Sequence, residues 1–207
     1  MSRIKSENSS LEGSAFRLWV VVLSAVTITG CTVTGTPREP VRAPSPNLSS
    51  VSIHPGPFSH RMNPGNDGTD YEPCSDVNRP AVQELGWDWS SRRDAAVVDR
   101  QTARGCVWKD TRHGSIWSLQ QVAGNSPSLV AYKRVNYFFD WLPDQWINGR
   151  QIVVFSMNPS TCVARVQSRR AGINTIVDSF EVPAPPIADI CSRAIAFTRA
   201  TISRMPE

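Results

Sequence analysis

The chain has 207 residues, of which 22 are Lys or Arg and 18 are Asp or Glu, and its formal charge is +4 at pH 7. This length suits one globular domain with a single core and leaves no room for a second domain. The basic surplus is modest and scattered along the chain, so we expect no nucleic acid as a partner. Nineteen of the basic residues are Arg. This bias is typical of codon usage in a GC-rich genome, and the alternative is recognition of phosphate or carboxylate groups.

Residues 1–30 are predicted to be a signal peptide that is cleaved off. Arg3, Lys5 and Arg17 precede or flank an apolar run of eleven residues, 18–28. That length fits the hydrophobic region of a signal peptide and is too short for a membrane span of about 20 residues. The rival interpretation is an uncleaved signal anchor, but no further apolar run of spanning length follows in the sequence.

The end of this run, Ile28-Thr29-Gly30-Cys31, resembles a lipobox, the bacterial pattern in which a dedicated peptidase cuts just before a cysteine. Cys31 would then be the first residue of the mature protein and would carry acyl chains such as palmitate. Diacylglycerol on its thiol together with an N-acyl chain gives stable anchoring, because more than one lipid chain is buried in the bilayer. We therefore expect a protein that contacts the cell membrane through a lipid anchor, on the extracytoplasmic side.

Residues 31–69 are predicted to be a disordered tether that starts with the acylated cysteine. Seven prolines stand between positions 37 and 64 among Ser, Gly and Asn, with few large apolar residues to form a core. Such a segment is extended and lifts the following domain off the membrane. His54 and His60 lie here without a carboxylate or thiol beside them in the sequence. We therefore assign no metal and expect no cofactor.

The folded domain is expected over residues 70–207, with its elements in the following order. A short helix at 78–86 is followed by strand candidates at 97–98, 106–108 and 115–122, and a second helix runs from Ser126 to about Tyr137. Three more strands at 151–157, 161–167 and 173–180 are separated by short loops, which imply an antiparallel meander. The last helix, Ile187 to Met205, has apolar residues at helical intervals. The prediction is an α+β domain, with an antiparallel sheet of about five strands covered by the C-terminal helix and one or two shorter helices.

Five cysteines are an odd number, and acylation of Cys31 leaves an even set in the folded part. Cys74, Cys106, Cys162 and Cys191 are expected to form two disulfides in an oxidising compartment, and four cysteines permit three pairings. We favour Cys106 with Cys162, which would join two strands. Cys74 would then pair with Cys191 and attach the start of the domain to its last helix.

Four short motifs surround these cysteines: residues 66–74 (NDGTDYEPC), Gly105-Cys106-Val107-Trp108, Cys162-Val163-Ala164-Arg165-Val166 and Asp189-Ile190-Cys191. In this order, behind a lipobox and a proline-rich tether, they resemble the actinobacterial envelope lipoproteins grouped as domain of unknown function 3558. The resemblance spans residues 66–206. It implies a disulfide-stabilised envelope lipoprotein, and it implies no activity, because none is established for the family.

Catalytic patterns are sparse. The sequence has no G-x-S-x-G elbow, no phosphate-binding glycine loop, no H-E-x-x-H and no dinucleotide fingerprint. His113 stands next to Gly114 in a predicted turn, which suits a solvated histidine better than a catalytic one. Asp140 and Asp144 could do acid and base work in a glycan-handling cleft. We expect a protein that is not an enzyme, and a hydrolase using these three residues is kept as an alternative.

The densest aromatic segment follows the middle helix and contains five aromatic residues in ten positions: Tyr137, Phe138, Phe139, Trp141 and Trp146. Such density means either core or interface, and we expect packing under the sheet. If exposed, these residues would form a surface for an envelope protein, glycan or lipid. The expected function is a non-catalytic binding module for an envelope component or protein partner. The alternative is a carrier or sensor that holds an apolar small molecule or lipid between sheet and helices.

Overall fold

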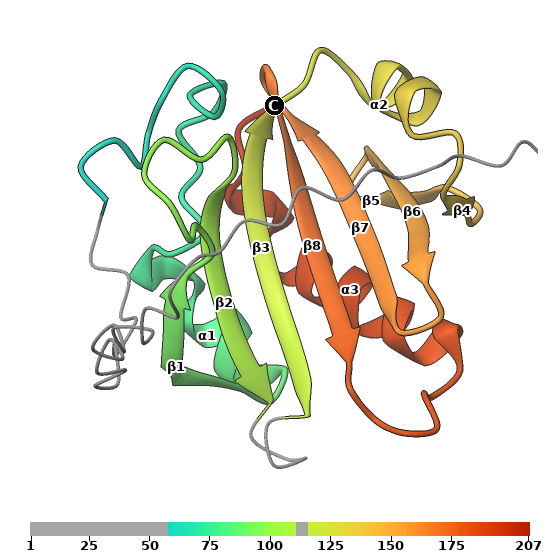
Figure 1. The fold of residues 1–207 in the computed structure, drawn as a ribbon. Coiled ribbons are helices and arrows are strands. Elements are labelled where there is room, and N and C mark those ends of the chain that lie inside the picture. Colours follow the sequence, from blue (N-terminus) through green and yellow to red (C-terminus); the bar gives the residue numbers. More distant parts are fainter. Residues whose placement is uncertain (1–57, 111–115) are drawn as a thin grey trace, which may run out of the picture. The chain divides into compact units, whose positions relative to one another are not determined.

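An antiparallel sheet of eight strands is the framework of residues 58–110 and 116–207, the part of the chain that the computed structural model describes (Figure 1). The order across the sheet is β1-β2-β3-β8-β7-β6-β4, and β5 also pairs with β6. The strands are β1 Trp87–Asp94, β2 Arg104–Asp110, β3 Trp117–Asn125, β4 Asp140–Trp141, β5 Gln145–Ile147, β6 Arg150–Asn158, β7 Thr161–Ser168 and β8 Ala171–Ser179. The predicted meander is confirmed as β6, β7 and β8.

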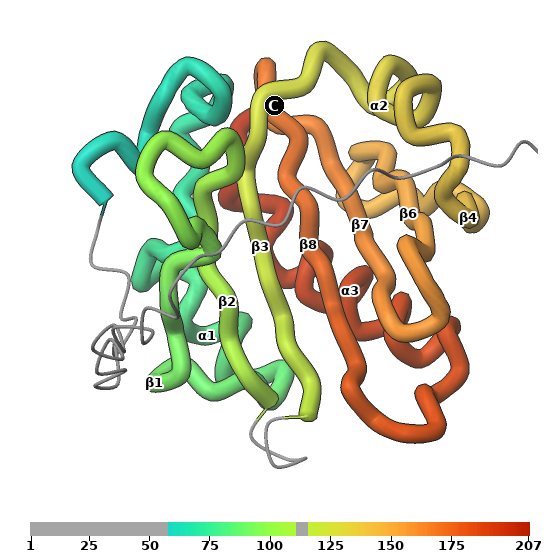
Figure 2. Tube along the Cα trace, in the orientation of Figure 1, coloured from blue at the N-terminus to red at the C-terminus, as the bar shows by residue number. Residues whose placement is uncertain are grey.

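Helices lie on both faces of this sheet. They are α1 Arg79–Glu84, α2 Leu129–Val135 and α3 Ile187–Thr201, with short 3-10 turns at Asp76–Asn78 and Ile202–Arg204. Helix α3 runs behind β7 and β8, and α2 lies at the end of the sheet where β3 ends and the C-terminus is found (Figure 2). None of the helices within residues 58–110 and 116–207 has the length and apolar character needed to cross a membrane.

The core lies between the sheet and α3. The buried residues Ile152, Val166, Ile173 and Ala123 form one row across β6, β7, β8 and β3, because antiparallel pairing places them side by side on the same face. Helix α3 contributes a stripe that includes Phe197, whose ring centroid is 5.8 Å from that of Trp108 on β2. The α+β class and the covering C-terminal helix are therefore confirmed.

A buried arginine holds the segment that leads into the domain. Arg104, at the start of β2, is fully buried and donates to the main-chain oxygens of Asn66, Thr69 and Tyr71. Its Nη1 also lies 2.9 Å from a carboxylate oxygen of Glu72. The motif at residues 66–74 thus wraps around one guanidinium, which gives this motif a structural role.

The prediction of about five strands was too low, and one predicted strand was wrong. Val97 and Val98 lie in the loop between β1 and β2 and are 77% and 58% exposed, because no neighbouring strand pairs with them. The edge strand β1 was missed since most of its residues are polar, and edge strands carry such residues where one side faces water. The very short β4 and β5 arise from the aromatic segment, which has no alternating pattern.

The disulfide pairing proposed from the sequence is wrong. The bonds join Cys74 to Cys106 and Cys162 to Cys191, with Cα atoms 5.3 and 5.0 Å apart. The expected partners Cys106 and Cys162 lie on β2 and β7, which β3 and β8 separate. Three steps of about 4.8 Å between strands give about 14 Å, well beyond the reach of a disulfide. Each bond instead attaches a segment outside the sheet to a strand beneath it.

Candidate functional site

The face of the sheet opposite α3, called the outer face below, is only partly covered. Aromatic rings from α2 and β4 pack over Phe155 of β6 at one edge of this face. Towards the middle, Val107, Gln120 and Ile176 are paired across β2, β3 and β8 and remain half-buried. A binding site on the sheet is therefore to be sought on this face, since α3 and the core occupy the other.

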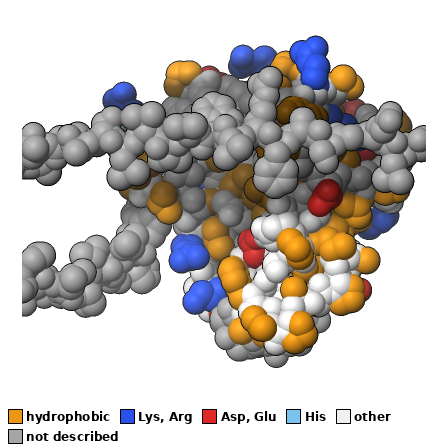
Figure 3. All heavy atoms as spheres, turned by 45° about the vertical axis from the view of Figure 1, so that its right-hand side comes forward, with side chains coloured by type: hydrophobic (Ala, Val, Ile, Leu, Met, Phe, Trp, Pro, Cys, Tyr) orange, Lys and Arg blue, Asp and Glu red, His pale blue; other side chains and the backbone are white. Residues whose placement is uncertain are grey.

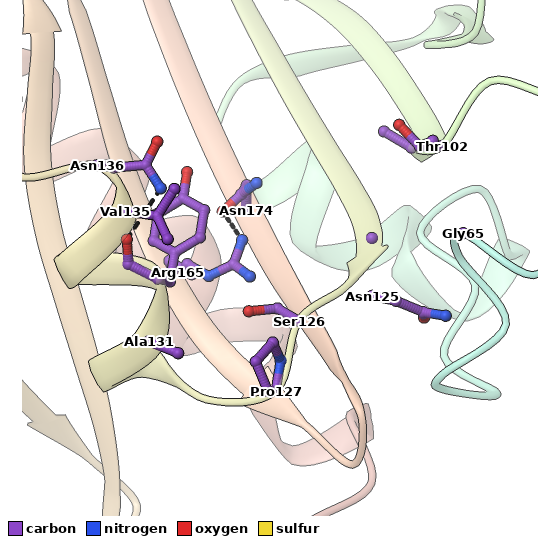
Figure 4. A pocket seen from close by; sticks show the side chains of 13 residues that line it. Gly65, Thr102, Asn125, Ser126, Pro127, Ala131, Val135, Asn136, Arg165 and Asn174 are labelled. Atoms are coloured by element: carbon purple, nitrogen blue, oxygen red, sulfur yellow. Dashed lines mark hydrogen bonds between the residues drawn. The ribbon is translucent and has the colours of Figure 1, made fainter.

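A hollow of about 400 Å³ lies on the outer face, at the end of the sheet where β3 leads into α2 (Figure 4). Helix α2 forms one wall, and Gly65 with residues 102–103 forms the opposite wall. Residues 124–127 connect the walls, and Arg165 of β7 and Asn174 of β8 form the floor. Among the described residues that line the hollow there is no Asp or Glu, and Arg165 is the charged one.

Arg165 is held in one orientation by three contacts. Its guanidinium carbon lies 3.7 Å from the centre of the Tyr132 ring on α2, and its Nη1 donates to Oδ1 of Asn174 at 2.7 Å. The other side of the guanidinium rests on Gly172, where a Cβ would lie 2.0 Å from Cζ. Arg165 and Asn174 can meet because they are paired across β7 and β8 and share the outer face.

Arg165 is only 3% exposed. Within residues 58–110 and 116–207, no carboxylate is paired with its buried positive charge. Burial lowers the pKa of Arg165 to about 10, an effect that Tyr132 opposes, so the side chain still carries its charge at pH 7. Its buried Nε donates to no acceptor of this part of the chain. Burying a guanidinium in this way costs on the order of several kcal/mol, and a desolvated aromatic ring recovers about 2 kcal/mol.

Substituting Gly172 by Ala is expected to displace Arg165 from this place. The new Cβ would lie 1.9 Å from Nη2, so the guanidinium would have to leave the ring of Tyr132. We expect the free energy of unfolding in urea to fall by about 1 to 3 kcal/mol, as is usual for overpacking. Gly124→Ala is the matched control, because Gly124 pairs with Gly172 across the sheet and its Cβ would meet only the oxygen of Thr102, at 3.5 Å. Equal effects of the two substitutions would contradict the described packing.

Of the five aromatic residues predicted as a possible surface, some are packed against the sheet and others are exposed. Phe139 stacks on Phe155 at a centroid distance of 4.9 Å, and Trp141 is tilted against the same ring at 4.7 Å, so these two side chains are packed. Tyr137, Phe138 and Trp146 are 80%, 66% and 69% exposed and remain available to a partner. Phe139 and Trp141 are half-buried on the outer face and do not belong to the core between the sheet and α3, so the segment does not pack under the sheet as expected.

A second group of exposed hydrophobic side chains lies at the other end of the sheet. Figure 3 shows hydrophobic atoms on the lower part of the molecule, the end at which Figure 1 places the β6–β7 turn and the segment that leads from β8 to α3. Met157, Phe180 and Val182 are the large exposed residues there, and Val182 is 97% exposed. The aromatic segment on the outer face and this end of the sheet are thus separate surfaces.

Asp140 and Asp144, the two described residues considered for catalysis, lie in different surroundings. Asp144 accepts hydrogen bonds from Lys133 at 2.5 Å and Gln151 at 2.7 Å, which is typical of a structural carboxylate. Asp140 is exposed on β4, and His113 lies outside the described residues. His60 contacts Asp99, with 2.8 Å between Nδ1 and Oδ2, at the surface. The part of the chain covered by the structure holds no group of three His, Cys, Asp or Glu residues that could bind a metal ion.

Arg165 is not singled out by composition, because it is one of nineteen arginines scattered along the chain. One feature of the strand 161–168 could have identified it: Arg165 stands between Ala164 and Val166 in a run of apolar residues. A charged residue inside such a run is rarely fully buried unless it is paired. The hollow itself could not have been predicted, because its walls come from segments far apart in the sequence.

Comparison with known proteins gives a family but no activity. A family model described as a protein of unknown function (DUF3558) matches residues 26–204. No curated protein and no solved structure gives a significant match. The matched range includes both disulfides and every residue that lines the hollow.

Proposed function

The chain belongs to the DUF3558 family, and from that premise we propose that it is an exported actinobacterial envelope lipoprotein with a non-catalytic binding domain. Acyl chains on Cys31 would hold it at the cell membrane, with the domain on the extracytoplasmic side. The domain would bind an envelope component, either a protein partner, a glycan or a lipid.

Two features support export and anchoring. The four cysteines at or beyond position 74 are all paired in disulfides, and such bonds persist mainly in oxidising compartments outside the cytoplasm. Cys31 is the fifth cysteine of the sequence and is not part of these two bonds; it stands shortly after the apolar run 18–28. A thiol at the end of a signal-like run, in a protein whose other cysteines are oxidised, is best explained by acylation.

The observation that carries the binding role is the hollow over Arg165. Its volume of about 400 Å³ falls within the range of roughly 300 to 1,000 Å³ that is usual for small-molecule sites. The exposed Tyr137 and Phe138 follow directly after Val135 and Asn136 of its wall, so a larger partner could contact both. A carrier of an apolar molecule would use the same hollow, because side chains already fill the space between the sheet and α3.

One experiment with the Cys31→Ser chain tests both parts of this proposal. Wild-type protein is expected in the membrane fraction, and the variant, which has no acylation site, is expected in the medium or soluble fraction. The soluble variant is then incubated with an extract of its native envelope and examined by native mass spectrometry. We expect a retained ligand, and we expect Ala131→Trp, which fills the hollow from α2, to reduce retention at least tenfold.

Val130→Trp is the matched control, because Val130 precedes Ala131 on α2, is 76% exposed and is not among the lining residues. It should retain the ligand like the parent chain. Absence of acyl chains from Cys31 in the mass spectrum of the wild-type protein would refute the lipid anchor. Retention that is unchanged by Ala131→Trp, or no retention at all, would refute the hollow as the binding site.

A further inference from the structure

The hollow contains a cation that differs from two other arginines of the described chain, the buried Arg104 and the half-buried Arg193. Arg104 forms an ion pair with Glu72 and also donates to three main-chain oxygens. Arg193 lies 2.7 Å from a carboxylate oxygen of Asp110. Within the described residues, Arg165 makes one hydrogen bond, to the neutral amide of Asn174. A guanidinium has five N–H groups, so most of its donor capacity is unused within residues 58–110 and 116–207.

The orientation of Arg165 suits an anion. The ring of Tyr132 covers one face of the guanidinium and Gly172 lies against the other, so a ligand can approach only at its edge. In Figure 4 the guanidinium lies between Asn174 and the residues Ser126 and Pro127, on the floor of the hollow. Arg165 is thus a buried arginine at the floor of the hollow, fixed in its plane and with an unused Nε donor. A guanidinium fixed in this way binds carboxylate and phosphate groups strongly.

The residues around Arg165 indicate which other groups a ligand of the hollow would carry. Asn174 uses its Oδ1 to accept from Arg165, and its Nδ2 makes no bond to the described residues, so it provides a second donor beside the guanidinium. Ala103, Pro127 and Val135 line the hollow with apolar surface. In the part of the lining that the structure describes, no acidic residue repels a negative charge.

We propose that the hollow binds the anionic group of a small ligand, a carboxylate or a phosphate carried on an apolar body, through Arg165 and Asn174. This inference rests on the proposed binding function and names the chemistry of its ligand. The anion supplies the countercharge for Arg165, and the apolar body lies along α2 and Pro127. Both carboxylates and phosphates present the oxygen pair that this edge recognises.

The test uses the soluble Cys31→Ser chain and three molecules with the same hexyl chain: heptanoate, hexyl phosphate and hexanol. Isothermal titration calorimetry at pH 7 is expected to show that at least one of the two anions binds ten times more tightly than hexanol. The stronger of the two identifies the group. Acetate and inorganic phosphate, titrated separately, should bind more weakly than their hexyl counterparts, because they make no contact with the apolar wall.

The Arg165→Met variant distinguishes an effect on anion binding from an effect on the stability of the fold. Replacing an unpaired buried charge by an apolar side chain of similar length is expected to leave the midpoint of thermal unfolding unchanged or raised. Affinity for the preferred anion should nevertheless fall at least tenfold, while hexanol binding stays the same. Arg134→Met, an exposed arginine on the same helix as Tyr132, is the control and should change neither.

The outcomes distinguish this inference from the proposed function. If hexanol binds as tightly as the anions, or if Arg165→Met binds anions like the parent chain, the anion inference is wrong and the hollow remains a site for neutral ligands. If none of the molecules binds, the anion inference is also wrong. The experiment with the envelope extract then decides separately whether the hollow binds anything.

Discussion

Replacing Arg104 with Met is expected to lower the free energy of unfolding by about 3 to 5 kcal/mol, as is typical when one partner of a buried polar network is removed. The side chain is fully buried and is the donor for the main-chain oxygens of Asn66, Thr69 and Tyr71. Methionine fills much of the volume but cannot donate. The three oxygens would be left without a donor, at a cost of about 1 to 3 kcal/mol for each one that stays buried.

Urea denaturation followed by tryptophan fluorescence measures this loss. Arg199→Met is the control, because Arg199 is exposed on α3 and should change the free energy of unfolding by less than about 0.5 kcal/mol. A loss below 1 kcal/mol for Arg104→Met would show that the segment 66–72 is not held by this arginine. Arg165→Met, by contrast, is expected to leave the stability unchanged or raised. It removes a charge that no carboxylate of the described chain neutralises.

Removing either disulfide is expected to cost about 3 to 4 kcal/mol, the value given by loop-closure entropy for loops of this length. The two loops are similar, with sequence separations of 32 and 29 residues. The double variants Cys74→Ala with Cys106→Ala and Cys162→Ala with Cys191→Ala should therefore lose similar amounts in urea denaturation. The loss arises mainly because the unfolded chain is less restricted.

The pairing itself is checked by peptide mapping without reduction. Proteolysis should yield one cross-linked peptide with Cys74 and Cys106 and another with Cys162 and Cys191. A peptide joining Cys106 to Cys162 would contradict the strand order, because two strands lie between them. A single-cysteine variant is less informative, since its free thiol can exchange with the remaining disulfide.

The elements that could be predicted from the sequence have regular patterns or short connections. Helix α3 repeats its apolar residues at helical intervals, and β6, β7 and β8 are joined by tight turns, so both were found nearly to their ends. The order of β3 beside β8 could not be found in this way, because it pairs Trp117 with Ser179 over a long stretch of chain. The error in disulfide pairing follows directly from this unknown order.

The candidate site was less predictable than the fold. Within the aromatic segment, Phe139 and Trp141 pack while Phe138 is exposed, and an irregular segment has no period from which this difference could be derived. Arg165 takes its importance from Tyr132 and Gly172, which lie on other elements. Composition alone could not separate this arginine from the exposed ones.

The bond between Cys74 and Cys106 determines how the domain carries a mechanical load. A pull on the N-terminal side of the chain reaches Cys74 before it reaches any strand, and the disulfide passes it directly to β2. The force therefore bypasses the edge strand β1, which would otherwise be the first strand to be peeled away. Residues between 74 and 106 stay unloaded while the bond is intact, so a domain tethered through its N-terminal end would resist extension until β2 itself is sheared from β3.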